Sequence, residues 1–181
     1  MILARSALIL TSTPNIYVEN MENNTKSNAA MRHMLRGLFG KDDNTVFVIS
    51  GAPGSGKSTY VESQKQKGDL VVDLDMIAAA LQGERTAHPD YTPVMDAVMA
   101  AREAVYRVVE SRQGQWNRAY IITSSPNKAQ VNELAKRLDG QIVRMQATQN
   151  ECISRIRSDR TRVAVDRDIG LVNKWFSEQT E

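Results

Sequence analysis

The sequence of 181 residues has a single cysteine, Cys152, and no apolar run long enough to span a bilayer. One cysteine cannot form an internal disulfide, so the fold must be held by an apolar core, and we expect Cys152 to be a small packing residue. The apolar opening at residues 1–10 is broken by Arg5 and lacks the charged start and the cleavage site of a signal peptide. We therefore expect a cytoplasmic protein with no membrane partner.

An excess of charge of one sign is also lacking. The chain has 23 Lys and Arg residues against 21 Asp and Glu residues, which leaves a formal net charge of +2. This excess is too small to indicate nucleic-acid binding by itself. A hydrophobic content of 41% and a charged content of 24% are typical of a soluble globular protein, and the length predicts one domain with its own core.

The first 43 residues do not fit the pattern of the rest of the chain. Residues 19–29 are rich in Asn, Glu, Ser and Lys and are typical of a linker. Residues 6–11 are compatible with an edge strand, and residues 31–40 with a short amphipathic helix. We therefore predict a partly flexible N-terminal extension at 1–43 and one nucleotide-binding domain at 44–181.

The most informative stretch is GAPGSGKS at residues 51–58, which matches the phosphate-binding loop pattern G-x-x-x-x-G-K-[ST] at every fixed position. A β-branched and aromatic strand is predicted before it, at 45–49, and a helix after it. Glycines allow positive φ, so successive N–H groups can converge on one anion, and the helix adds its positive end. We expect the loop to bind ATP or another nucleoside triphosphate. Its nucleotide-binding residues are then Gly51, Ala52, Pro53, Gly54, Ser55, Gly56, Lys57, Ser58 and Thr59.

Two acidic residues stand at the end of the next predicted strand, residues 70–75. The carboxyl ends of parallel strands face the ligand crevice, so Asp73 and Asp75 should lie near the loop. Either carboxylate can serve as a base or as a direct or water-mediated partner of Mg²⁺, with the Ser58 hydroxyl as a second ligand. A structural role is also compatible with the sequence, because Asp75 stands where a helix N-cap is expected.

Two further strands, at 118–124 and 141–146, alternate with helices. This alternation predicts a three-layer α/β domain with a parallel sheet, and we expect its four strands, numbered along the chain, in the order 2-3-1-4. The third strand ends in Thr123 and Ser124, where many phosphate-loop enzymes carry an acidic Mg²⁺ ligand. Metal binding would then depend on Ser58 and the aspartate pair.

A long polar connection at 82–93 should run beside the crevice, where His88, Asp90 and Tyr91 can contact an acceptor or remain simple loop residues. The following helix carries an apolar stripe that should face the sheet. Arg102 lies off that stripe, and a solvated face is favoured over a position in the crevice.

Four arginines fall within eight positions of the segment 151–162. Arginine binds phosphate oxygens with a planar fork of donors, so contact with a bound nucleotide is one reading of this run. A solvated basic helix face is the other.

The order of these features resembles the P-loop kinase group, especially the kinase domains related to bacteriophage polynucleotide kinase, and phage-encoded, AAA-like P-loop ATP-binding proteins. The resemblance covers about residues 44–165. It implies a P-loop NTPase fold that uses ATP and Mg²⁺. It implies that Asp75 activates the acceptor hydroxyl. The loop motif itself predicts that Lys57 contacts the β- and γ-phosphates, and we expect Ser58 and Asp73 to hold the metal. The resemblance also implies an arginine-rich lid over the donor phosphates, made by Arg155, Arg157 and Arg160.

Two functions follow as hypotheses. The first is a Mg²⁺-dependent kinase that transfers the γ-phosphate to a hydroxyl of a nucleic-acid end, a nucleotide or a small molecule. The second is an ATPase or nucleotide-binding regulatory module without an acceptor, which acts with a protein partner.

Overall fold

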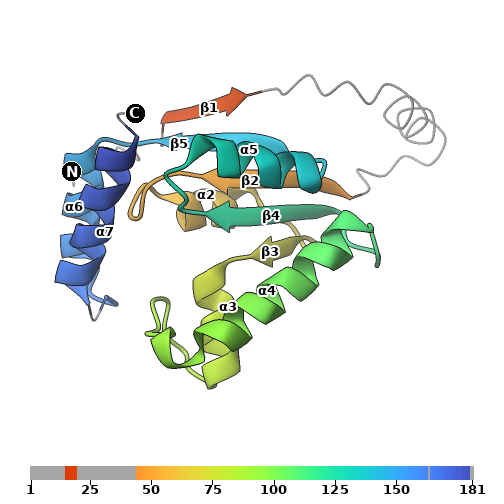
Figure 1. Cartoon of the computed structure of the whole chain (residues 1–181), viewed down its shortest axis with the longest axis horizontal. Helices are drawn as coiled ribbons and strands as arrows, with labels where there is room; N and C mark the ends of the chain where they lie inside the picture. The colour runs from red at the N-terminus through yellow and green to blue at the C-terminus, as the bar shows by residue number, and fades with distance from the viewer. Residues whose placement is uncertain (1–14, 20–43, 163, 180–181) are drawn as a thin grey trace, which may run out of the picture.

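The computed structural model describes residues 15–19, 44–162 and 164–179, and its centre is a five-stranded sheet (Figure 1). The strands are β1 (Asn15–Glu19), β2 (Thr45–Ser50), β3 (Leu70–Val72), β4 (Arg118–Thr123) and β5 (Gln141–Gln146), in the order β1-β5-β2-β4-β3. Strands β2 to β5 are parallel. Counted along the chain as in the sequence prediction, these four have the order 2-3-1-4, which confirms the predicted topology.

Strand β1 adds an antiparallel edge that the sequence did not predict. All five of its residues pair with β5, from Asn15 opposite Gln146 to Glu19 opposite Ile142. The edge strand expected at 6–11, the short helix at 31–40 and residues 20–29 of the linker lie outside the described residues. One strand of the sheet thus belongs to the segment 1–43, and the division at residue 44 stays a prediction.

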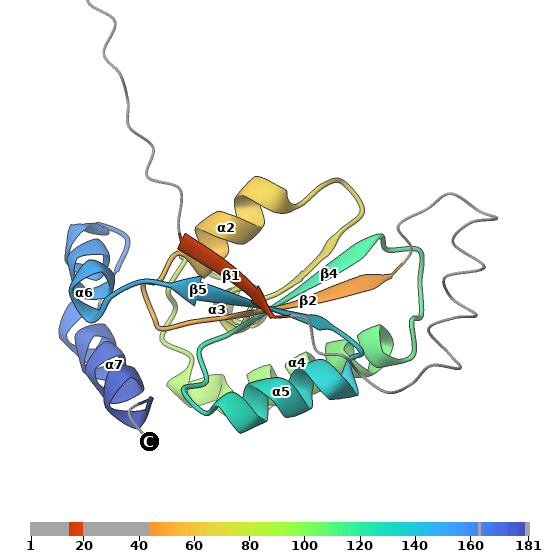
Figure 2. The same cartoon turned by 90° about the horizontal axis from the view of Figure 1, so that it is seen from above.

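Helices cover both faces of the sheet. Helix α2 (Lys57–Gln64) lies over one face, and α4 (Met95–Glu110) and α5 (Lys128–Arg137) lie over the other (Figure 2). Helix α3 (Leu74–Gln82) packs against α4, and the short 3-10 helix η1 (Thr92–Val94) leads into α4. The sheet has an apolar cluster on each face, one around Val48 and Ile121 and the other around Ile49 and Val143. This gives the three layers of a P-loop NTPase fold.

The last two helices, α6 (Gln149–Ser158) and α7 (Val165–Glu178), pack together beside the carboxyl end of β5 (Figures 1 and 2). Thr148 and Glu151 form a capping box that fixes the start of α6. Cys152, Ile156 and Val172 are fully buried with Ala52 of the phosphate loop. The predicted packing role of Cys152 is therefore confirmed, and the α6–α7 pair is held directly against the loop. Among the residues that the structure describes, no helix has the length and apolar character that crossing a membrane requires.

The position of β1 leads to a prediction for a chain that lacks residues 1–43. Every core residue whose side chain is described comes from 46–176, so residues 44–181 should still unfold cooperatively. Loss of the β1 ladder should lower the Tm by about 5 °C, and the uncovered edge of β5 should favour self-association. Thermal unfolding and light scattering measure both effects. A truncated chain without a cooperative transition would show that the segment is required for the core.

Candidate functional site

The phosphate loop joins the end of β2 to the start of α2 through a backbone that requires glycine. Gly54 and Gly56 have φ of 75° and 94°, in the left-handed region, and Gly56 is the N-cap of α2. A Cβ at Gly54 would lie 2.8 Å from the carbonyl oxygen of Cys152, so α6 packs against the loop backbone itself. The loop therefore presents the N–H groups of the α2 N-terminus toward one concavity.

Lys57 is buried inside this loop. Its Nζ donates to the carbonyl oxygens of Gly51 and Ala52, both at 2.8 Å, and only 7% of the residue is exposed. Burial lowers the pKa of the Lys57 ammonium to about 8, although the nearby Asp73 and Asp75 charges act in the opposite direction. The loop thus holds a fixed cation at its centre.

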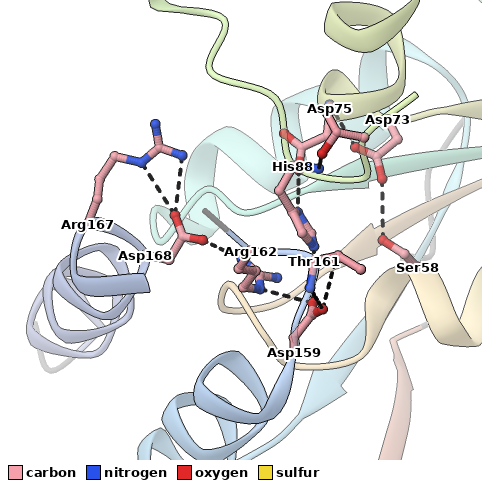
Figure 3. Close-up of polar contacts among 10 residues, drawn as sticks. Ser58, Asp73, Asp75, His88, Asp159, Thr161, Arg162, Arg167 and Asp168 are labelled. Atoms are coloured by element: carbon pink, nitrogen blue, oxygen red, sulfur yellow. Dashed lines mark hydrogen bonds and ion pairs between the residues drawn. The ribbon is translucent and has the colours of Figure 1, made fainter. Parts of the chain in front are cut away.

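The two residues expected to hold Mg²⁺ touch each other. The Ser58 hydroxyl donates to Asp73 Oδ2 at 3.3 Å, and Asp73 Oδ1 accepts a hydrogen bond from the backbone N–H of Asp75 at 3.0 Å (Figure 3). Within the described residues, no group of three or more His, Cys, Asp or Glu side chains is placed to hold a metal. One carboxylate and one hydroxyl beside a phosphate loop nevertheless fit Mg²⁺, which keeps several waters and binds mainly through substrate phosphates.

The geometry at Asp73 corrects two expectations. Strand β3 ends at Val72 rather than at residue 75, and α3 begins at Leu74. The N-cap of α3 is Asp73, whose side chain accepts from Asp75, so Asp75 is not the cap and lies in the first turn of the helix. Its carboxylate is therefore free of a capping role.

Asp75 is paired with His88, from the connection between α3 and η1. Nδ1 of His88 lies 3.2 Å from Asp75 Oδ2, and Nε2 lies 3.3 Å from Asp159 Oδ2 (Figure 3). Burial raises the pKa of the Asp75 carboxyl and the Asp73 charge raises it further, while the hydrogen bond with His88 lowers it. A carboxyl group with a raised pKa is the stronger base when ionised, as general-base catalysis requires.

A chain of ion pairs continues from His88 to α7. Asp159 lies 3.3 Å from Nε of Arg162, and Nη1 of Arg162 lies 2.6 Å from Asp168 Oδ2. The Asp168 side chain is only 7% exposed, and its other oxygen faces Arg167 at 3.4 Å. Figure 3 shows this series of contacts, which runs from Asp75 of α3 to Asp168 of α7. The carboxylates at the end of β3 and in α3 are thereby connected to the C-terminal helices.

The predicted arginines are not all brought to the loop. Nη1 of Arg155 donates to the carbonyl oxygens of Ser55 at 3.2 Å and of Gly54 at 3.4 Å. Arg157 and Arg160 are exposed, and neither lines the cavity described below. Their contact with donor phosphates stays a prediction.

A cavity of about 650 Å³ extends from the loop to α4 and α7. Six of the predicted nucleotide-binding residues line it: Pro53, Gly54, Gly56, Lys57, Ser58 and Thr59. Gly51, Ala52 and Ser55 are buried beneath them. The wall also contains both aspartates and the three loop residues considered as acceptor contacts, His88, Asp90 and Tyr91. The residues predicted to bind the nucleotide and those considered as acceptor contacts thus line one cavity.

Three further arginines line the cavity wall, and of these only Arg167 was not considered from the sequence. Arg162 and Arg167 come from the turn before α7 and from α7 itself, and Arg102 comes from α4. The solvated face expected for Arg102 is therefore wrong. A position off the apolar stripe of α4 is compatible with solvent exposure and with a place in the cavity wall. Only the tertiary structure shows that this face of α4 borders the cavity.

The fold and the loop together define a nucleotide-binding protein of the P-loop group. A family model described as an AAA domain matches residues 46–169, which is more than half of the chain, and the chain belongs to this family. A comparison with curated proteins found no match.

Among solved structures, a chain from "Structure of the Pnkp1/Rnl/Hen1 RNA repair complex" is similar, with 14% sequence identity and a TM-score of 0.48. The match covers 74% of this chain and 45% of that chain, so this protein corresponds to less than half of its length. A likeness this remote says nothing about activity.

The pKa of Lys57 leads to a prediction about nucleotide affinity. Phosphate oxygens bind the protonated ammonium, so ATP affinity should fall as the pH rises through about 8, by up to tenfold for each pH unit above it. Calorimetric titrations between about pH 6.5 and 9.5 measure this dependence. Lys57→Met should bind weakly without this pH dependence, and Lys128→Met, an exposed lysine of α5, should behave as the wild type. A wild-type affinity that stays constant over the range would contradict the assignment.

Proposed function

We propose that the protein is an ATP- and Mg²⁺-dependent phosphotransferase that acts on a hydroxyl group, with Asp75 as its general base. The observation that carries this proposal is the position of Asp75. Its partly exposed carboxylate lines the same cavity as Lys57 and Ser58, and it has no capping role because Asp73 caps α3. A general base beside the phosphate loop can activate the hydroxyl of an acceptor for phosphoryl transfer.

The loop residues bind the donor. The N–H groups at the start of α2 and the Lys57 ammonium bind the β- and γ-phosphates. Ser58 and Asp73 hold Mg²⁺, which supplies neutralisation of phosphate charge when it is bound. The Arg155 guanidinium, whose Nη1 donates to the Gly54 and Ser55 carbonyls, would meet charge on the transferring group.

The transfer step uses Asp75. The carboxylate accepts the proton of the acceptor hydroxyl as the acceptor oxygen forms its bond to the γ-phosphorus. The bond between that phosphorus and the bridging oxygen breaks, and ADP leaves with the electron pair. His88 orients the Asp75 carboxylate through the 3.2 Å contact. The acceptor is a nucleic-acid end, a nucleotide or a small molecule with a free hydroxyl.

Asp75→Asn keeps the size of the side chain and removes its charge. ATP should still bind, while transfer should fall by roughly a hundredfold or more, because the hydroxyl loses its base. The assay is labelled γ-phosphate transfer to a panel of 5′-hydroxyl oligonucleotides, nucleosides and small hydroxyl metabolites. Asp73→Asn should act mainly on the Mg²⁺ dependence, and Asp96→Asn, an exposed residue of α4 outside the cavity, should have no effect.

The outcomes separate the two functions considered for this chain. Full transfer by the Asp75→Asn protein at saturating ATP and acceptor would remove Asp75 as the base. Phosphate release that no acceptor stimulates, with equal rates in the wild type and in Asp75→Asn, would instead identify an ATPase or a nucleotide-binding module without an acceptor.

A further inference from the structure

Four arginines line the cavity, and three of them already have acceptors. Arg155 donates to the loop carbonyls of Gly54 and Ser55. Arg162 is paired with Asp159 and Asp168, and Arg167 with Asp90 and Asp168. Arg102 differs from all of them, because no hydrogen-bond acceptor or carboxylate within the described part of the chain contacts its guanidinium.

The Arg102 side chain is nevertheless held in place. Its Nε is buried and has no hydrogen-bond partner among the described residues. Its guanidinium carbon lies 5.5 Å from the centroid of the Tyr106 ring, and Tyr106 is itself only 5% exposed. A cation on the face of a fixed aromatic ring loses little further freedom when it binds an anion. Arg102 is therefore a preorganised cation rather than a mobile surface charge.

The course of α4 explains why Arg102 faces the cavity. Met95 and Arg102 are separated by seven residues, or about two turns, so they share one face of the helix, and both line the cavity. The neighbouring Glu103 does not neutralise this charge, because its carboxylate binds Arg137 at 2.6 Å and Arg107 at 3.6 Å. The guanidinium is thus left for a group that enters the cavity.

We infer that Arg102 binds an anionic group of the acceptor, so that the acceptor carries a phosphate or a carboxylate in addition to the hydroxyl that is phosphorylated. This inference rests on the proposed phosphotransferase function. The same wall contains the Asp75 carboxylate, which would repel an anion, and Arg102 supplies the opposite charge on a different helix. Planar guanidinium groups with unpaired N–H donors bind phosphate and carboxylate oxygens through paired hydrogen bonds. The two charges would orient the acceptor with its hydroxyl toward Asp75 and its anion toward α4.

Matched pairs of probes test this inference. Adenosine and adenosine 3′-monophosphate form the phosphate pair, and glycerol and glycerate form the carboxylate pair. Each probe is titrated calorimetrically into the full-length protein saturated with Mg²⁺ and a non-hydrolysable ATP analogue, and its KM is measured with ATP. The wild type should favour the charged member of one pair by about tenfold or more in Kd and KM, and the pair that shows this preference identifies the anion.

The variants assign that preference to one side chain. Arg102→Gln should reduce the ratio within the pair to about one, leave the neutral probe and the ATP analogue bound as before, and change KM more than kcat. Arg102→Lys, which keeps the charge, should retain part of the preference. Arg107→Gln, on the same helix but outside the cavity, should match the wild type. Thermal unfolding of each variant confirms that the fold is retained.

Two results would overturn the inference: a wild type that binds neither charged probe more tightly than its neutral partner, or an Arg102→Gln protein that keeps the preference. The binding measurements need no phosphate transfer, so they are independent of the proposed activity. A charge preference lost in Arg102→Gln without any transfer would contradict the proposed function alone, and transfer without any charge preference would contradict this inference alone.

Discussion

The site depends on one buried ammonium group. Lys57 lies inside the phosphate loop with its Nζ on two backbone carbonyls, and burial lowers its pKa to about 8. A buried cation of this kind is tolerated only when nearby groups of opposite charge offset its loss of hydration. Asp73 and Asp75 provide that charge, and both raise the pKa of Lys57. The position of the β3–α3 junction next to the loop therefore offsets part of the cost of burying Lys57.

Two carboxylates stand at this junction, and like charges at short range repel each other. The structure gives the two carboxylates different surroundings. Asp73 accepts hydrogen bonds from Ser58 and from the backbone of Asp75, whereas burial and the Asp73 charge raise the pKa of Asp75. Two neighbouring carboxylates in unequal environments can take different roles, one toward a metal and the other toward a proton.

Much of this arrangement was predictable from short motifs. The phosphate loop, its flanking elements and the sheet order follow from local periodicity and from topological rules that operate over many residues. The end of β3 was not predicted correctly: the sequence indicated Asp75 as the helix cap, whereas the backbone ends the strand at Val72 and makes Asp73 the cap. Strand β1 is five residues long and precedes a polar segment, so its pattern is too short to identify. Arg102 required the tertiary structure, since a helical wheel does not distinguish a cavity wall from open solvent.

The contact between His88 and two carboxylates shows how the proposed base is joined to the C-terminal helices. A neutral imidazole carries one N–H, so it can donate to Asp75 or to Asp159 but not to both. Both contacts become hydrogen bonds only in the imidazolium form, which then links α3 to the C-cap of α6. Asp159 is also paired with Arg162, and Arg162 with the buried Asp168. A proton on His88 therefore lets one side chain donate to Asp75 and to Asp159, the C-cap of α6, at the same time.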